Sequence, residues 1–276
     1  VPVMGVLVMP AAVLAMCLAP FGLWQVGLWL MESGLRWILF VAGSVSKLEG
    51  ALSHVLAPDP KVLPLLALGL LWIILWRGRL RFLFGPALVC LAALSWASTQ
   101  RPDILVADNG ALIGVLTTDG RALSKPTGSS FVAGIWLEND GAPAPQDVAA
   151  ARPGMQREGR IVWADLLDWK ILQVSGKTAL ATLVGCNEAD VLISNQTVPD
   201  GYPCEVFDIE RLRGTGAIAI NAMDNGDLRI VTAHQVAGLR PWNQRQGAIG
   251  PNIILSRVER KRAANATLLT QQLVNQ

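Results

Sequence analysis

The chain has 276 residues, of which 52% are hydrophobic and only 16% charged, and its formal net charge is +2. Soluble domains carry charge on about a quarter of their residues, so this composition excludes a chain that is solvated by water throughout. Nine charged residues precede residue 100, and the residues beyond it contain 17 Lys and Arg against 18 Asp and Glu. The second part therefore lacks the large basic field that drives nucleic-acid binding, and any contact with DNA has to be local.

The first apolar stretch begins almost at the start of the sequence. The run from Val3 to Ala19 carries no charge and is about long enough to span hydrocarbon, with a kink expected at Pro10. The sequence opens on Val1 and has neither the basic segment nor the small-residue cleavage site of a signal peptide. We therefore expect it to be the C-terminal piece of a longer protein.

A second apolar stretch, from Leu23 to Val45, contains Glu32 and Arg36. Because residues four apart share a helix face, these two charges are expected to pair. The stretch could cross a membrane, re-enter it or lie at its surface.

Two further apolar stretches follow a polar loop from Ser46 to Lys61. They run from Val62 to Trp76 and from Leu83 to Ala97. Each has about fifteen residues, which is short for a membrane span, so a helical hairpin that dips into the membrane is an alternative to two crossings.

Arg77, Arg79 and Arg81 lie between these two stretches. Short cytoplasmic loops are enriched in Lys and Arg, so the three arginines predict that this connection is inside the cell. Everything after Ser98 is then expected outside, which in a bacterium with two membranes is the periplasm.

Beyond Arg101 the sequence changes to short β-type runs separated by turn residues. Asp108-Asn109-Gly110 and Thr118-Asp119-Gly120-Arg121 are typical of hairpin turns. The expected strands are Ile104 to Ala107, Ala111 to Thr117, Phe131 to Leu137, Lys170 to Val174, Ala179 to Val184, Val191 to Ser194, Ala217 to Asn221 and Leu228 to Thr232.

Helices are expected from Gln146 to Ala151 and from Glu205 to Leu212, where basic residues follow at the C-terminal end. This mixture predicts a layered α/β domain. Past Ala233 the periodicity is lost, and the basic run from Arg257 to Arg262 leads into an Ala-, Thr- and Gln-rich end. We expect a loose tail there rather than a DNA-binding arm.

Few residues of the second part can support metal or phosphate chemistry. The two histidines are His54, in the membrane part, and His234, expected to be a surface or hydrogen-bonded residue, so no histidine-rich zinc cluster is expected. The segment from Arg213 to Gly216 lacks the spacing and the lysine of a phosphate-binding loop. We predict no catalytic residue, no metal ligand and no cofactor.

The acidic residues occur singly on expected loops, where they are typical of turns and caps. Carboxylates can nevertheless bind a hard metal without histidine. The acidic residues in question are Asp108, Asp119, Asp140, Asp190, Asp208 and Asp224.

The four cysteines fall into two pairs. Cys17 and Cys90 lie in apolar segments and are expected to be packing residues. Cys186 and Cys204 lie in the second part, and a periplasmic location would permit a disulfide between them. The sequence leaves open whether they are joined.

The order of these features resembles the C-terminal end of the ComEC family, the inner-membrane channel proteins for DNA uptake in natural transformation. MPAAVLAMCLAPFGLWQ is similar to the end of the family's polytopic competence domain, and RPDILVADNGALIGVLTTDGR to the entry into its metallo-β-lactamase-like domain. CNEADVLISNQTVPDGYPCEVFDIERLRGTGAIAI is similar to the end of that domain. The resemblance implies an αββα sandwich, with Ile104 to Thr117 and Ala217 to Thr232 in its sheets.

The chain departs from this family where the zinc ligands would be. Members with an active-looking domain carry a His-x-His-x-Asp-His motif and a later histidine-rich turn, proposed to serve a nuclease. Here no histidine lies between Phe131 and Lys170, and Ser194-Asn195-Gln196-Thr197 stands where the later histidines are expected. We therefore expect a degenerate domain without metal-dependent hydrolysis.

Three parts are predicted: a transmembrane helical region over 1–99, a degenerate metallo-β-lactamase-like domain over 100–256, and a tail over 257–276. The leading hypothesis is a fragment of an inner-membrane DNA-uptake channel with a non-catalytic periplasmic domain. Its implied partners are single-stranded DNA, the lipid bilayer, other competence proteins and preceding membrane helices of the same protein.

Two alternatives belong to other classes of protein. One is a membrane-anchored hydrolase that holds a metal through carboxylates such as Asp108, Asp190 or Asp208. The other is a membrane-anchored structural or sensory domain with no role in DNA uptake.

Overall fold

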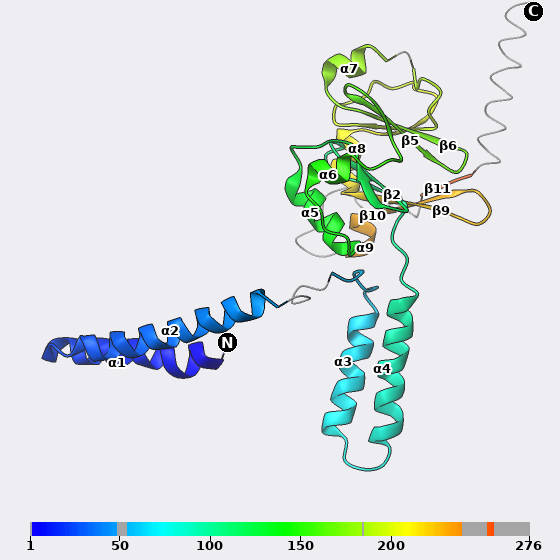
Figure 1. Cartoon of the computed structure of the whole chain (residues 1–276). Coiled ribbons are helices and arrows are strands. Elements are labelled where there is room, and N and C mark those ends of the chain that lie inside the picture. Colours follow the sequence, from blue (N-terminus) through cyan, green and yellow to red (C-terminus); the bar gives the residue numbers. More distant parts are fainter. Residues whose placement is uncertain (1, 49–53, 184, 239–252, 257–276) are drawn as a thin grey trace, which may run out of the picture. The chain divides into compact units, whose positions relative to one another are not determined.

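The computed structural model describes residues 2–48, 54–183, 185–238 and 253–256. By its internal packing the chain divides into two units, Val1–His54 and Val55–Gln276, whose elements are traced in Figure 1. The expected domain boundaries at residues 99 and 256 stay predictions. The expected loose tail over 257–276 lies outside the described residues.

The first unit is a pair of apolar helices. A π-helical turn η1 (Met4–Val8) leads into α1 (Met9–Leu18), a 3₁₀ turn η2 (Ala19–Phe21) follows, and α2 (Trp24–Ser46) returns. Pro10 has no N–H to bond the preceding turn, and the disturbance expected there takes the form of the π-helical turn just before it. Gly22, at φ +74°, ends the 3₁₀ turn that follows α1.

Small residues allow α1 and α2 to pack closely. A Cβ atom on Gly27 would lie 2.5 Å from the backbone nitrogen of Ala15, so the two backbones approach as small residues permit in membrane helix pairs. The side chains of Glu32 and Arg36 form an ion pair at 2.6 Å, which confirms the expected pairing. Met4–Phe21 and Trp24–Ser46 are both long and apolar enough to cross a membrane, and most of each span is exposed.

A second helical hairpin opens the second unit. It consists of α3 (Val62–Leu75) and α4 (Arg81–Ala97), close to the two expected apolar stretches. Gly69 and Gly85 face one another, since a Cβ on either would come within 3.1–3.2 Å of the other's carbonyl oxygen. With 14 and 17 residues, the helices are about 21 and 26 Å long.

Eleven strands of the described chain form two sheets. The six-stranded sheet has the order β11 (Ile253–Leu255), β10 (Leu228–Thr232), β9 (Ile218–Ala222), β1 (Ile104–Val106), β2 (Ile113–Thr117) and β3 (Gly120–Leu123). The five-stranded sheet has the order β4 (Gln156–Glu158), β5 (Ile161–Leu166), β6 (Trp169–Val174), β7 (Val191–Ser194) and β8 (Glu205–Phe207). The first sheet is antiparallel throughout, whereas β6, β7 and β8 run parallel.

Three apolar clusters define the layers of the domain. The largest lies between the sheets, where Ile104 and Ile113 of one face Ile171 and Ile193 of the other. A second lies between the six-stranded sheet and the helices α5 (Ser130–Asn139) and α6 (Gln146–Ala150).

The third cluster lies on the outer face of the five-stranded sheet, beside α7 (Lys177–Ala181). The order of layers is therefore helix, sheet, sheet, helix (Figure 1). The expected mixed α/β region is confirmed at this level, with α8 (Ile209–Thr215) and α9 (Ala233–Ala237) completing it.

Both expected hairpin turns are present, but two predicted strands are wrong. Phe131 to Leu137 lies in α5, where Ala133, Trp136 and Leu137 are buried at helical spacing. Ala179 to Val184 begins in α7, which ends at Ala181. In α5 the exposed apolar residues Phe131 and Ile135 hide the helical period and imitate a strand, whereas α7 has only five residues, too few to show a period.

The predicted helix from Glu205 to Leu212 is only partly correct. Its first residues form β8, and α8 begins after Asp208, whose side chain accepts a hydrogen bond from the Arg211 N–H as a helix N-cap. The segment after Ala233, where no periodicity was expected, begins with α9, which Thr232 and Gln235 close in a capping box.

A buried ion pair joins the segment after α4 to the domain. The Arg121 guanidinium is fully buried and lies 2.5 Å from an Asp140 carboxylate oxygen, and Arg101 binds the other oxygen of Asp140 at 2.8 Å. Arg121 also donates to the carbonyl oxygens of Gly114 and Pro102, both at 3.0 Å. One carboxylate thus connects the chain entering the domain, the β2–β3 hairpin and the end of α5.

Replacing Asp140 by Asn should destabilise the domain strongly, because it leaves the Arg121 charge buried without a counter-charge. Removing one partner of a buried pair costs about 3–5 kcal/mol. Urea unfolding of the full chain in detergent, followed by tryptophan fluorescence, measures the loss. The matched control is Glu188→Gln, which breaks the exposed pair with Lys170 and should change little. Equal effects of the two substitutions would contradict this account.

Candidate functional site

The segment Ser194–Thr197, where histidines were expected in the family pattern, lies at the end of β7 against the β1–β2 turn. The Gln173 amide donates a hydrogen bond of 2.8 Å to the Gly110 carbonyl oxygen. Gly110 has φ +65° and stands so close to Ser194 that a Cβ atom would lie 2.5 Å from the Ser194 carbonyl oxygen. The two sheets therefore meet at this point through backbone and amide groups.

The polar side chains at this junction bind backbone N–H groups. The Ser194 hydroxyl accepts from the Gln196 N–H at 3.0 Å, and the Asn195 side-chain oxygen accepts from the Gly176 N–H at 2.7 Å. Neither residue is a usual zinc ligand, for which imidazole, thiolate or carboxylate groups are needed. Within the described ranges no three His, Cys, Asp or Glu residues come together in a way that could hold a metal ion.

The three carboxylates that would hold a metal ion if the chain were a hydrolase lie on separate elements. Asp208 caps α8 and also accepts from the Val198 N–H at 3.2 Å. Asp190 accepts from the Lys170 N–H at 2.8 Å, between β6 and β7. Asp108 is exposed in the β1–β2 turn. In the described part of the chain they serve as cap and turn residues and do not converge on a common centre.

His234 is hydrogen-bonded, as expected. Its Nδ1 lies 2.6 Å from the Gly214 carbonyl oxygen. Because a carbonyl oxygen only accepts, Nδ1 carries the proton. The expected plain turn after Arg213 is the end of α8, where Gly216 has φ +73°.

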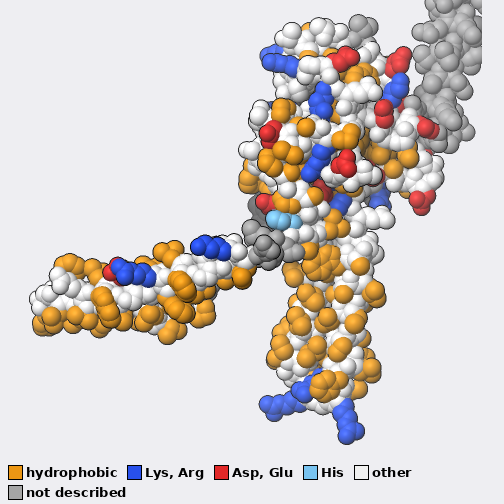
Figure 2. All heavy atoms as spheres, in the orientation of Figure 1, with side chains coloured by type: hydrophobic (Ala, Val, Ile, Leu, Met, Phe, Trp, Pro, Cys, Tyr) orange, Lys and Arg blue, Asp and Glu red, His pale blue; other side chains and the backbone are white. Residues whose placement is uncertain are grey.

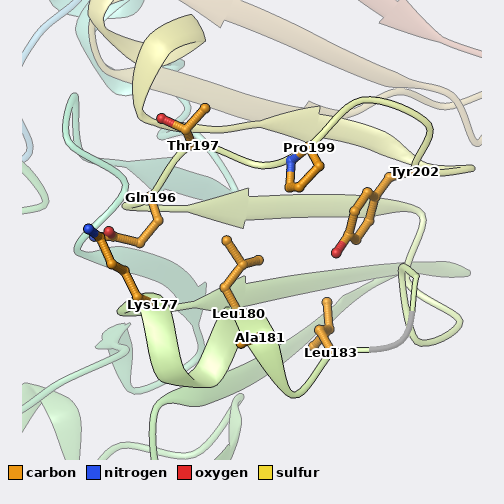
Figure 3. Close-up of a pocket in the computed structure, with 8 residues that line it drawn as sticks. All are labelled: Lys177, Leu180, Ala181, Leu183, Gln196, Thr197, Pro199 and Tyr202. Atoms are coloured by element: carbon orange, nitrogen blue, oxygen red, sulfur yellow. The ribbon is translucent and has the colours of Figure 1, made fainter.

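An open pocket of about 520 Å³ lies on the outer face of the five-stranded sheet (Figure 3). One wall is α7 and the residues just after it, and the other is the loop between β7 and β8. Figure 3 shows Lys177 and Gln196 together at one end and Tyr202 at the other, with leucines between them. The lining comprises Lys177, Leu180, Ala181, Leu183, Gln196, Thr197, Pro199 and Tyr202.

A disulfide joins Cys186 to Cys204, with the Cα atoms 6.1 Å apart. The bond links the segment after α7 to the start of β8 and therefore ties together the two walls of the pocket. Closing a loop of this length in the unfolded chain stabilises the folded state by about 3 kcal/mol in the chain-entropy treatment. Cys17 and Cys90, the other two cysteines, are free and exposed on the apolar helices.

Basic side chains line the edge where β3 and β4 adjoin. Arg157 donates to the Leu123 carbonyl oxygen at 2.7 Å, and Arg152 donates to that of Arg121 at 2.9 Å. Burial lowers the pKa of Arg157 and of Lys125 from their usual values. Arginine and lysine side chains are ordinarily charged at neutral pH, so basic groups gather at this edge.

The three arginines between α3 and α4 occupy the tip of the second helical hairpin, where they appear as the blue atoms at the end of an otherwise apolar pair (Figure 2). Arg77 and Arg79 are exposed, and the Arg81 guanidinium lies over the Phe82 ring at 4.4 Å from its centre. The tip thus carries a concentrated positive charge next to apolar helix surface.

Residues 1–80 match the model of the Competence protein family. The match covers α1, α2 and α3, and the rest of the chain is unassigned. No curated protein and no solved structure matches the chain.

The sequence did not single out the pocket. Lys177 and Gln196 are common surface residue types, and no motif connects them to Tyr202 across the disulfide-bonded loop. The one available signal is that Tyr202 is the single tyrosine of the chain and stands between a glycine and a proline two residues before Cys204. An aromatic residue between two turn-forming residues indicates that the loop fixes the position of the ring.

Replacing Gly110 by Ala should destabilise the junction between the sheets, because the new Cβ would meet the backbone of Ser194 and the residue would be strained at φ +65°. We expect a loss of about 2–4 kcal/mol, combining backbone strain with overpacking. Gly185→Ala is the matched control, since Gly185 has φ +61° with nothing within 4 Å. Both variants carry the strain of a positive φ, and only Gly110→Ala adds the steric contact. The difference between their free energies of unfolding in urea therefore measures the steric contribution. Similar stability of the two variants would contradict the close contact.

Proposed function

We propose that this chain is part of an inner-membrane channel protein that takes up DNA in natural transformation. The observation that carries the proposal is the match of residues 1–80 to the Competence protein family over helices whose apolar side chains face outward. Helices with this surface need a hydrocarbon solvent. In this proposal they contribute to the path of the strand, together with other competence proteins.

The proposed orientation depends on the α3–α4 hairpin. A hairpin that ended inside the bilayer would place Arg77, Arg79 and Arg81 in hydrocarbon, where each charge costs about 2.5–3.5 kcal/mol even on the lowest scales. Reaching the opposite interface avoids that cost and agrees with the enrichment of basic residues in cytoplasmic loops. The domain after α4 then lies in the periplasm, where the disulfide between Cys186 and Cys204 is stable.

We further propose that the periplasmic domain is a degenerate metallo-β-lactamase-like sandwich without catalytic activity. Its support is the helix-sheet-sheet-helix order and the neutral residues Ser194 to Thr197 at the position of the expected metal ligands. The domain acts as a docking module for the incoming strand instead of a nuclease.

Deleting the gene in its native host should reduce transformation with linear chromosomal DNA to the level of spontaneous mutation, because the strand loses its membrane path. Selected colonies are counted after DNA is added to competent cells, and the full gene supplied in trans should restore them. Electroporated plasmid should enter deletion and parent strains equally, which controls for viability and recombination. Unchanged transformation in the deletion strain would refute the proposal.

A nuclease assay separates the docking domain from the hydrolase alternative. The purified full chain is incubated with labelled single-stranded DNA and Zn²⁺, Mn²⁺ or Mg²⁺, and no metal-dependent cleavage is expected. Cleavage that disappears in Asp208→Asn or Asp190→Asn variants would instead assign the domain to the carboxylate hydrolases.

A further inference from the structure

The β3 edge of the six-stranded sheet is closed by arginine side chains. β3 pairs with β2 on one side only, so alternate carbonyl oxygens on its other side have no strand partner. Arg152 donates to the Arg121 carbonyl oxygen and Arg157 to that of Leu123, two residues further along. Lys125 follows after another two residues.

The two carbonyl oxygens that hold Arg152 and Arg157 belong to residues two apart on β3. Residues two apart on a strand are separated by about 7 Å, close to the distance between successive phosphates of an extended nucleic-acid strand. The guanidiniums of Arg152 and Arg157 are held by backbone carbonyl oxygens, so their positions are fixed before any ligand arrives. Preorganised cations lose less side-chain freedom on binding.

Among the described residues, no carboxylate pairs with the charge of this row. Lys125, Arg152 and Arg157 take no part in the ion pairs found among the described residues, which involve other side chains. Burial alone lowers the pKa of Lys125 and Arg157, without a neighbouring acid to offset it. Glu158 is the next residue on β4, but successive side chains of a strand point to opposite faces. The row therefore presents uncompensated and partly dehydrated positive charge.

Two more cations, Arg160 and Lys177, lie at or near the pocket. Arg160 follows β4, and its guanidinium lies beside Gly176, where a Cβ atom would come within 2.7 Å of it. Gly176 has φ +92° and directly precedes Lys177, which lines the pocket. Arg160 and Lys177 are both exposed. Arg160 thus lies beside the residue that precedes Lys177, and Figure 3 shows Lys177 with Gln196 at one end of the pocket.

The pocket has the composition of a base-binding hollow. Its leucines and Pro199 give an apolar lining, the Tyr202 ring supplies an aromatic face, and the Gln196 amide offers both a donor and an acceptor. Base stacking on aromatic rings beside a basic groove is how single strands are held without sequence preference. A smaller hollow that Asp200 and Asp208 line with Tyr202 bounds the pocket on its far side, so the cationic path ends there.

We propose that the row formed by Lys125, Arg152, Arg157, Arg160 and Lys177 binds the phosphates of a single nucleic-acid strand, one base of which enters the pocket against Tyr202. The inference rests on the proposed function and assigns its docking role to these residues. A strand fits better than an anionic lipid surface, because Lys177 lines a concave pocket that also holds an aromatic ring. A bilayer would meet a broad and flat basic face.

The test measures binding of fluorescein-labelled oligothymidylate to the full chain in phosphatidylcholine nanodiscs, by fluorescence anisotropy over a series of salt concentrations. The test variant is Arg160→Gln with Lys177→Gln, since neither side chain has a hydrogen bond within the described chain. It should bind more weakly, and its slope of log affinity against log salt should be shallower by about 1.4, because each of the two phosphates that is no longer neutralised changes the slope by about 0.7. The matched control, Lys170→Gln with Arg229→Gln, removes the same charge on other strands and should keep the slope of the wild type.

The pocket is tested with Tyr202→Ala and Tyr202→Phe. Removal of the ring should weaken oligothymidylate binding about tenfold, whereas Phe keeps the stacking surface and the affinity. An abasic chain of the same length should bind equally to all three proteins. Equal loss for the abasic chain would show that the substitution disturbs the fold and would overturn the base pocket.

The remaining outcomes separate the inference from the proposed function. Equal slopes for the test and control pairs would overturn the inference, even if the gene is needed for transformation. Loss of binding to phosphatidylglycerol vesicles in the test pair, with DNA binding intact, would make the edge a membrane contact. If the gene is dispensable for transformation while the test pair behaves as expected, the proposed function falls and the nucleic-acid site stands.

Discussion

The outward-facing apolar surface of the helices is the constraint on which the rest of the structure depends. Trp29, Leu39 and Ile74 are each 66–74% exposed on helices that have no covering layer in their own units. Burying such a side chain in an apolar medium is worth about 1.5–3 kcal/mol, so water is not a tolerable solvent for the whole set. Hydrocarbon satisfies these residues, and it then restricts where the three arginines of the α3–α4 tip can lie. In the proposed orientation, the arginines set the side of the membrane on which the domain lies.

The domain itself is held by packing, hydrogen bonds, a buried ion pair and a disulfide. Its sheets share a large apolar core, and their backbones lie close together where Gly110 meets Ser194. The Asp140 carboxylate ties the entering chain to the domain, and the disulfide ties α7 to β8 across the pocket. A sandwich stabilised in this way keeps its shape when the residues at an expected metal position are neutral. In the proposed function it presents an edge and a pocket for binding.

The sequence predicted the apolar helices and the hairpin strands well, because charge-free runs and Asn-Gly or Asp-Gly turns are local signals. It failed for α5, whose outer face exposes Phe131 and Ile135 and so hides the helical period, and for α7, which is only five residues long. The edge strand β4 is exposed throughout and has no apolar alternation to reveal it. The pocket and the basic row could not be predicted, since they arise from residues that only the fold brings together. The pairing of Cys186 with Cys204 was left open for the same reason.

The most direct test of the account is the side of the membrane on which Cys186 and Cys204 lie. The full-length protein, with Cys17 and Cys90 replaced by Ala, is treated in intact cells with a membrane-impermeant maleimide, before and after a reductant that reaches the periplasm. The account predicts no labelling before reduction and labelling of both cysteines after it. Labelling that appears only after the inner membrane is broken would place the domain in the cytoplasm, and the orientation, the disulfide and the docking of an incoming strand would all have to be abandoned.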